Sequence, residues 1–383
     1  MATGTLAPIA RYQAFDSNGN PVSGAKLYTF EAGTSTPAET WSNVELTSSN
    51  ANPLIASSTG LFGPIFLETG HSYKFVLNNA SDVLLWSQDN VTATPSLAST
   101  PAALNGTCDL RLSLTSGVPV TTADVTAATL VYIEPYQGNR LSLYDGTSWN
   151  ARTVSAASFS TPAVANGVYD VFAYDNNGVP GFETLVWTSD TARATGLTVQ
   201  DGILSKSGQV TRRYLGSFRT TGVSGQTEDS AAKRYLFNYY HRVRKPLRVV
   251  EATNSWGYTV AAWQQANAAA GNQVDILCGW AEVPIDLTVN AVGSNNTGGV
   301  NFYAGIGEDG ITLATGVMNN VGPAITGGNA IRHPATARLL KFPAVGRHYY
   351  TWLEYSEATG VTTWYGDNGG VISQSGLFGY WEC

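Results

Sequence analysis

Residues 283–291 read VPIDLTVNA, and this stretch decides the fold class of the chain. Its apolar residues alternate with polar residues or proline, so an extended strand would have one apolar face and one wet face. An amphipathic helix would instead repeat its apolar residues every three or four positions. The stretch therefore predicts a half-buried β-strand. Pro284 predicts an edge position or a bulge, because proline has no N–H to donate to a neighbouring strand.

The same alternation recurs in residues 73–77 and 110–114, and no long stretch shows a sustained helical period. The 40 glycines and the aromatic content of 11% suit many short strands joined by tight turns. Asn-Gly and Asp-Gly pairs favour the left-handed backbone of hairpin turns. Turn-forming sequences occur at DSNGN (16–20), YDGTSW (144–149), YDNNG (174–178), GEDG (307–310) and GDNGG (366–370). We expect an all-β chain built from antiparallel modules.

A chain of 383 residues is too long for one ordinary hydrophobic core, so two or three domains are expected. The segment TATPSLASTPAALNG (92–106) is rich in Pro, Ser, Thr and Ala, which favours a linker, and a second break falls near TTGVSGQTEDS (220–230). The predicted division is an N-terminal β module (1–95), a linker (96–106), a middle β module (107–225) and a C-terminal β-sandwich (226–383), with a jelly roll as one candidate topology. Residues 229–238 and the alanine-rich stretch after Trp263 are weak helix candidates that fit strands or loops equally well.

Composition excludes several classes of function. The chain carries a net charge of −7, so no nucleic-acid partner is expected. No apolar run approaches the ~18 residues of a spanning helix, and the first residues lack the features of an export signal. We therefore expect no membrane insertion. We also expect the chain to be synthesised in a reducing cytoplasm. The cysteines, which match no metal-ligand spacing and predict no disulfide framework, are Cys108, Cys278 and Cys383.

Catalytic and metal-binding patterns are missing from the sequence. Glu228 and Asp229 are adjacent, whereas glycosidic cleavage needs two carboxylates that face each other across the substrate, so a loop or helix-cap role is expected. Residues 305–307 (GIG) lack the third glycine of a nucleotide fingerprint and predict a turn at a strand end. No G-x-S-x-G elbow occurs. The histidines, none of them in a metal-binding arrangement, are His71, His241, His333 and His348. We expect no enzyme, no metal and no cofactor.

The first quarter of the chain carries a distinctive set of motifs in order. It contains YQAFDSNGNPVSGAKLY (12–28), GTSTPAETW (33–41), NANPLIASSTG (50–60) and SYKFVLNNASDVLLWSQDNV (72–91). These segments resemble the N-terminal module of tail-fibre and tailspike proteins of bacteriophages and prophages. The resemblance implies that residues 1–95 attach the protein to other virion proteins and that the fibre is a homotrimer.

A looser resemblance covers residues 110–150 and 211–243, which are similar to a module of uncharacterised phage structural proteins. Together the resemblances imply a virion protein, assembled in the bacterial cytoplasm, whose C-terminal domain binds a host-surface polysaccharide or lipopolysaccharide. Two alternatives stay open. One is a purely structural virion protein, such as a head fibre, a capsid decoration or a tail adaptor, and the other is a polysaccharide-depolymerising tailspike. The last ranks lowest because such tailspikes usually contain a long parallel β-helix.

Aromatic and basic residues supply the candidate binding groups. Outward-facing rings near the C-terminus would suit either sugar stacking or a subunit interface. The basic run between residues 211 and 248 holds nine of the 21 Lys and Arg residues, which either face an anion or pair with carboxylates elsewhere. The glycan-binding candidates are Trp256, Tyr258, Trp352, Trp364 and Tyr365, and the anion-contact candidates are Arg242, Arg244 and Lys245.

Overall fold

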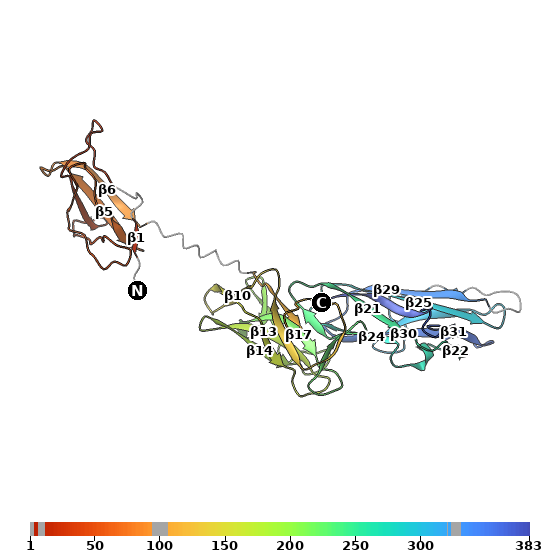
Figure 1. The fold of residues 1–383 in the computed structure, drawn as a ribbon. Helices are drawn as coiled ribbons and strands as arrows, with labels where there is room; N and C mark the ends of the chain where they lie inside the picture. Colours follow the sequence, from red (N-terminus) through yellow and green to blue (C-terminus); the bar gives the residue numbers. More distant parts are fainter. Residues whose placement is uncertain (1–3, 7–11, 94–105, 320, 323–330) are drawn as a thin grey trace. The chain divides into compact units, whose positions relative to one another are not determined.

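The described part of the chain is all-β, as predicted. The computed structural model describes residues 4–6, 12–93, 106–319, 321–322 and 331–383. Within these residues the only helical element is a single 3₁₀ turn, η1 (Ala266–Ala268), and no helix is long and apolar enough to cross a membrane. The chain divides into two compact units, unit 1 (1–102) and unit 2 (103–383) (Figure 1). Of the predicted linker at 96–106, all residues except Gly106 lie outside the described residues.

Unit 1 is built around a four-stranded antiparallel sheet in the order β3–β2–β5–β6. Its strands are β2 (Lys26–Glu31), β3 (Leu54–Ile55), β5 (Ser72–Asn78) and β6 (Leu84–Thr92), and a separate pair is formed by β1 (Gly4–Leu6) and β4 (Phe66–Glu68). Alternate residues of β5 are buried, as its sequence pattern predicts. The buried set includes Tyr73, Phe75 and Leu77, which pack with Leu27 of β2 into one core.

The turn at residues 16–20 shows how the sequence closes a hairpin in unit 1. The Asp16 carboxylate accepts hydrogen bonds from the backbone N–H groups of Asn18 (2.9 Å) and Asn20 (2.8 Å). Gly19 has a φ of +81°, a left-handed conformation that residues with a Cβ rarely adopt. The turn predicted from DSNGN is therefore confirmed.

The first half of unit 2 packs two antiparallel sheets and a hairpin around a shared core. The sheets have the orders β12–β9–β7 and β14–β13–β17–β16–β15, and β20 also pairs with β17. The strands are β7 (Leu110–Ser113), β9 (Leu130–Pro135), β10 (Arg140–Tyr144), β11 (Trp149–Thr153), β12 (Ala157–Ser160), β13 (Val168–Asn176), β14 (Val179–Val186), β15 (Leu197–Gln200), β16 (Ile203–Lys206), β17 (Gln209–Arg219) and β20 (Leu236–Asn238). Leu112, Ile133, Val171 and Phe218 lie in their common core.

Two larger sheets form the second half of unit 2. The eight-stranded sheet runs β28–β26–β30–β24–β19–β18–β8, with β23 beside β30. The seven-stranded sheet runs β21–β32–β25–β29–β27, with β31 beside β25 and β22 beside β31. The first contains β8 (Val125–Ala128), β18 (Thr227–Asp229), β19 (Lys233–Arg234), β23 (Gln264–Gln265), β24 (Gln273–Cys278), β26 (Phe302–Glu308), β28 (Val321–Gly322) and β30 (Gly346–Ser356). The second contains β21 (Arg244–Val250), β22 (Ser255–Tyr258), β25 (Ile285–Asn295), β27 (Met318–Asn319), β29 (His333–Lys341), β31 (Thr362–Tyr365) and β32 (Gly376–Glu382). Among the named pairings only β19 with β24 is parallel.

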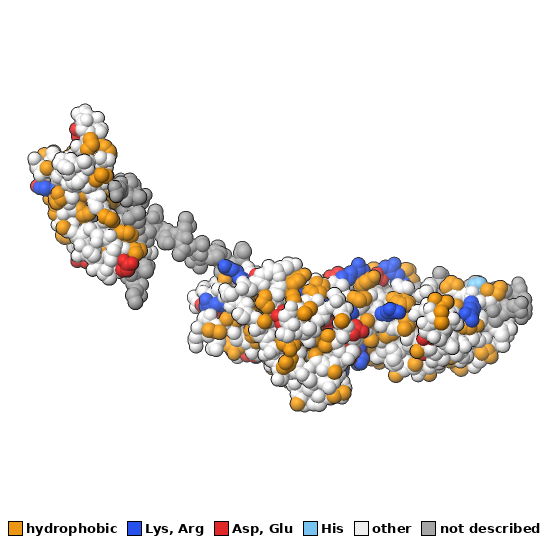
Figure 2. Space-filling model, in the orientation of Figure 1, with side chains coloured by type: hydrophobic (Ala, Val, Ile, Leu, Met, Phe, Trp, Pro, Cys, Tyr) orange, Lys and Arg blue, Asp and Glu red, His pale blue; other side chains and the backbone are white. Residues whose placement is uncertain are grey.

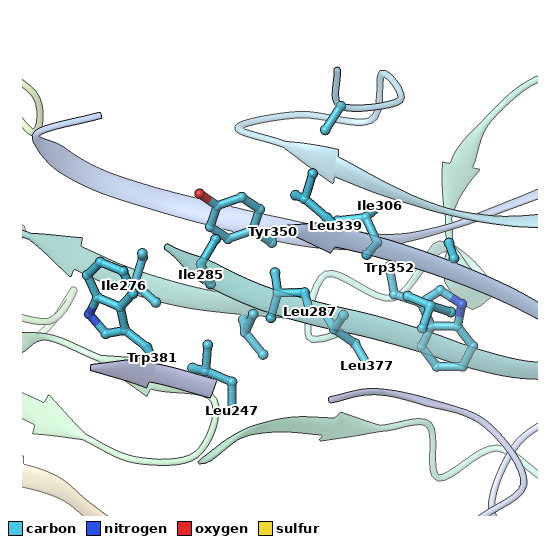
Figure 3. Close-up of a cluster of buried hydrophobic side chains, with 14 of the residues drawn as sticks. Leu247, Ile276, Ile285, Leu287, Ile306, Leu339, Tyr350, Trp352, Leu377 and Trp381 are labelled. Atoms are coloured by element: carbon cyan, nitrogen blue, oxygen red, sulfur yellow. The ribbon is translucent and has the colours of Figure 1, made fainter. Parts of the chain in front are cut away.

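The two sheets face each other across one hydrophobic core, so this half of unit 2 is a β-sandwich (Figure 3). Leu287, Leu377 and Trp381 come from the seven-stranded sheet, and they meet Ile276 and Trp352 from the eight-stranded sheet. All five side chains are essentially removed from solvent. Full burial of each large apolar side chain contributes about 1.5–3 kcal/mol to folding, so this core dominates the stability of the sandwich.

The strand that decided the fold class occupies the middle of its sheet. β25 pairs with β32 on one side and with β29 on the other, and Pro284 lies just before its first residue. The predicted edge position for this stretch is therefore wrong. Proline is tolerated because it precedes the ladder rather than interrupting it. β32, in turn, lies between β21 and β25.

The predicted boundary at residues 225 and 226 does not separate two compact units. Thr220 bridges Thr227, so the glycine-rich segment between them closes a hairpin within unit 2. β18 pairs with β8, and the Asn238 side-chain oxygen accepts a hydrogen bond from the backbone N–H of Leu112 at 2.6 Å. Gly and Ser mark turns inside a domain as readily as they mark linkers, which explains the difference. The weak helix candidate at 229–238 contains β19 and β20 instead.

Candidate functional site

Three of the five predicted glycan-stacking residues lie in the core. Trp352 and Trp364 have no solvent-exposed surface, and Tyr258 is 8% exposed. Each occupies an inward position on its strand, since neighbouring residues on a strand point to opposite faces. A ring that packs inside the sandwich cannot stack on a sugar, so these three assignments are wrong.

The other two, Trp256 and Tyr365, are partly exposed but engaged in internal contacts. The indole N–H of Trp256 donates a hydrogen bond to Glu354 at 2.7 Å. The guanidinium of Arg332 lies 3.8 Å from the centre of the Tyr365 ring and covers it. The five predicted residues therefore do not form a single ligand-facing surface.

Most of the basic run is neutralised within the molecule. Arg213 is buried and donates to the backbone carbonyls of Thr107 and Ser142. Ion pairs hold most of the others, namely Arg212–Glu183, Arg219–Asp190, Lys233–Glu228, Arg234–Asp229, Arg242–Glu282 and Lys245–Asp229. Of the three anion-contact candidates, Arg242 and Lys245 are thus committed to carboxylates. Glu228 and Asp229 lie on strand β18 rather than in a loop or at a helix cap.

Arg244 and Arg248 are the members of the run that stay exposed, and among the described residues they form no ion pair. Both project from β21 on the outer face of the seven-stranded sheet, and Arg244 lies 4.2 Å above the ring of Tyr380. A shallow groove of about 270 Å³ crosses this face. We call it the basic groove; it is lined by Pro246, Leu247, Arg248, Asp286, Thr288, Phe378, Gly379 and Tyr380. Figure 2 shows Lys and Arg side chains beside hydrophobic ones on unit 2.

A second hollow, on the outer face of the eight-stranded sheet, combines rings with a carboxylate. It has a volume of about 370 Å³ and is lined by Trp263, Tyr303, Tyr355 and Glu357, all of them partly exposed. We call it the aromatic hollow. Four side chains converge on one cavity here, whereas the predicted stacking residues are scattered or buried.

The strand register explains how these side chains meet. Tyr303 of β26 is directly opposite Tyr355 of β30, with ring centres 5.6 Å apart. On the other side of β30, Gln264 is opposite Glu354, and one further residue along this ladder places Trp263 beside Tyr355. The ring centres of Trp263 and Tyr355 are 5.3 Å apart. Three neighbouring segments therefore contribute one ring each to a row across the sheet.

Gly305 provides the space in which Trp263 lies. A Cβ atom added at Gly305 would come within 2.8 Å of both the Trp263 ring and the Leu313 side chain. The indole therefore rests against the bare backbone of β26. Residues 305–307 lie inside this strand, so the turn predicted for GIG is wrong. A glycine in a strand interior marks a site of close approach, as it does here.

The carboxylate of Glu357 is held at the rim by Asn301. The backbone N–H and the side-chain amide of Asn301 donate to its two oxygens at 3.2 and 3.1 Å. Glu357 forms no ion pair with any described residue, and none of the residues that line the hollow is basic. The hollow therefore offers hydrogen-bond acceptors and negative charge, but no positive charge.

Beneath the hollow, Glu354 anchors the segment that carries Trp263. Its carboxylate accepts hydrogen bonds from the side chain of Gln264 at 2.6 Å and from the backbone N–H of Asn267 at 3.2 Å. Glu354 is fully buried, and burial raises its pKa to about 7. These hydrogen bonds hold residues 263–267 against β30, so the position of Trp263 is fixed by the folded structure without a ligand.

The described residues contain no cluster of His, Cys, Asp and Glu arranged to hold a metal ion. All three cysteines are free and buried, and burial raises the pKa of Cys108 to about 11. The sequence patterns alone did not select Trp263, Tyr303, Tyr355 or Glu357. A usable signal was present in YSE (355–357), because residues two apart on a strand share a face.

No protein-family model and no curated protein matches the chain. Among solved structures, a tryptic core variant of Bacillus thuringiensis Cry1Da is 9% identical, with 66% of this chain aligned to 48% of that chain and a TM-score of 0.19. This chain thus spans about half the length of the Cry1Da chain. A structure of infectious bursal disease virus, Gx strain, is 9% identical, with 99% of this chain aligned to 77% of that chain and a TM-score of 0.23. Similarities this low carry no information about fold or function.

Proposed function

We propose that this chain is a phage virion fibre protein that binds a host-surface glycan through the aromatic hollow of unit 2. The observation that carries the proposal is the convergence of Trp263, Tyr303, Tyr355 and Glu357 on one cavity. Aromatic faces bind the apolar faces of sugar rings, and a fixed carboxylate accepts hydrogen bonds from hydroxyl groups. Ligand sites typically combine such apolar walls with a few placed polar groups.

The division of labour between the units supports the same proposal. Unit 1 is compact by itself, and its residues carry the resemblance to particle-attachment modules. Unit 2 contains the aromatic hollow. One stacked ring contributes only ~1 kcal/mol beyond the area that it buries, so a homotrimer would strengthen weak contacts through multivalency.

The test is retention of fluorescently labelled full-length protein on a panel of bacterial cells and on immobilised glycans. Trp263→Ala and Tyr355→Ala should abolish retention on every surface that the parent protein binds. Phe342→Ala is the matched control, because Phe342 is an aromatic residue, 62% exposed, outside both the hollow and the basic groove. Equal retention by all three variants, each with unchanged thermal unfolding, would refute the assignment of the site.

A purely structural virion protein is the second candidate, and the outer face of the seven-stranded sheet favours it. This face exposes large apolar side chains on the two strands that flank β25, among them Leu340 (59%) of β29 and Tyr380 (48%) of β32, beside the basic groove. Exposed apolar surface next to unpaired arginines suits a contact with a neighbouring virion protein. Normal virion assembly and adsorption with Trp263→Ala, together with loss of assembly with Tyr380→Ala, would favour this candidate.

Polysaccharide depolymerisation remains the third candidate. The antiparallel sheets of unit 2 give no support to the parallel β-helix that such tailspikes usually contain. The adjacent carboxylates Glu228 and Asp229 are engaged by Lys233, Arg234 and Lys245. We therefore expect binding without cleavage.

A further inference from the structure

The rings of the aromatic hollow are turned against one another rather than laid flat. The planes of Trp263 and Tyr355 make an angle of 55°, and those of Tyr303 and Tyr355 an angle of 76°. Coplanar rings would offer a flat platform to the face of a sugar. Tilted rings in contact offer a mixture of edges and partly exposed faces instead, and an exposed ring face can bind an ammonium ion through its π electrons.

The charge of the hollow points in the same direction. Glu357 lies in the lining, its two oxygens held by the neutral donors of Asn301, and it has no basic partner among the described residues. Since the ring centres are 5.3 and 5.6 Å apart, a cation would not lie between the rings but over their exposed faces in the hollow, where it would also meet the Glu357 carboxylate. An anionic group would be repelled by both.

The basic groove provides an internal contrast. It exposes Arg248 beside Phe378 and Tyr380, on the other sheet of the sandwich. Asp286 also lines the groove but is paired with Arg338, so the charge left unpaired there is that of Arg248, opposite in sign to Glu357 in the aromatic hollow. An acidic sugar would suit the basic groove better than the aromatic hollow. The charge of the hollow therefore selects among glycans and disfavours acidic ones.

We propose that the aromatic hollow binds an ammonium group carried by its ligand. Two sources of this chemistry are an amino sugar with a free amine and a choline substituent on a surface glycan. The inference rests on the proposed function only for the glycan that carries the group; binding of the group itself follows from the rings and Glu357. The step is reversible binding and involves no covalent change.

The experiment uses the intact chain and compares choline with 3,3-dimethylbutan-1-ol, a neutral molecule of the same shape. Binding is measured by ligand-observed NMR on the methyl signals. We expect choline to bind at least about 10-fold more tightly than the neutral molecule, because only choline gains the cation–π and carboxylate interactions. Glucosamine against N-acetylglucosamine tests the amino-sugar source in the same way. Equal binding within both pairs, or no binding of either cation, overturns the inference.

Variants locate the site. Glu357→Gln should weaken choline about 10-fold and leave the neutral molecule unchanged, while Tyr355→Ala should weaken both ligands. Phe342→Ala, outside both the hollow and the basic groove, should change neither. If Glu357→Gln fails to fold, the comparison of the two ligands on the parent chain decides alone. Cell or glycan retention that depends on Trp263 while neither choline nor glucosamine binds overturns the ammonium inference and leaves the proposed function standing. Choline binding without any cell or glycan retention supports the ammonium inference and refutes the proposed glycan binding.

Discussion

Gly305→Ala should destabilise unit 2 by displacing the Trp263 ring from β26. The new Cβ would lie 2.8 Å from the ring and from Leu313, whereas carbon atoms pack at about 3.5–4.0 Å, so the ring must retreat by roughly 1 Å. Overpacking of this kind costs about 1–3 kcal/mol. The replacement of a strand glycine by alanine returns about 0.5–1 kcal/mol of backbone entropy. The expected net loss is therefore about 1 kcal/mol, within bounds of about 0 and 2.5 kcal/mol.

Urea unfolding of the full-length chain measures this loss. The matched control is Gly310→Ala, since a Cβ at Gly310 meets no atom within 4 Å and should leave stability within about 0.5 kcal/mol. A double-mutant cycle assigns the cause: in a Trp263→Ala background the cost of Gly305→Ala should nearly vanish, because Leu313 can then move into the vacated space. A cost that is the same with and without the indole would refute the close approach of Trp263 to β26.

Four further expectations follow from the same features. Burial raises the pKa of Glu354 from 4.5 to about 7 in the folded state, so protonated Glu354 favours folding at low pH. The free energy of unfolding should therefore fall by at most about 3 kcal/mol as the pH rises from about 4.5 to 7. Glu354→Gln should remove that part of the pH dependence in urea titrations at pH 5 and pH 8. Residues 103–383 alone should unfold cooperatively, since they form one compact unit; an insoluble fragment would contradict this. Light scattering of the whole chain should give three times 40.6 kDa, and a monomer at micromolar concentration would exclude the homotrimer. Host polysaccharide should keep its chain length after incubation; release of oligosaccharides would support the depolymerase alternative.

Much of the architecture is local enough to be read from the sequence. The alternation in β5 and β25 predicts which residues are buried, and the DSNGN turn depends on residues within itself. The boundary at 225 and 226 failed because a glycine-rich hairpin and a linker share one composition. Only long-range pairings, such as β8 with β18, distinguish the two.

The candidate site was harder to predict because burial of an aromatic ring is decided across the sandwich. Alternation requires one residue of the pair Trp364–Tyr365 to face outward, but the sequence does not say which. The structure buries Trp364 and leaves Tyr365 at the surface. The position of Trp263 depends on Gly305, 42 residues further along the chain, and no local pattern connects them.

The place of β32 between β21 and β25 has a consequence for the order in which unit 2 can assemble. β21 has its partner only when a strand made more than a hundred residues later has been inserted beside it. Until then the backbone groups of β21 and β25 are open edges that could pair with another chain. Contacts of such long sequence separation form slowly, so the nascent sandwich should be vulnerable to aggregation and dependent on chaperones until β32 is in place. Once formed, a strand paired on both sides cannot fray from an edge, and its amide protons should exchange with solvent only when the whole sheet opens.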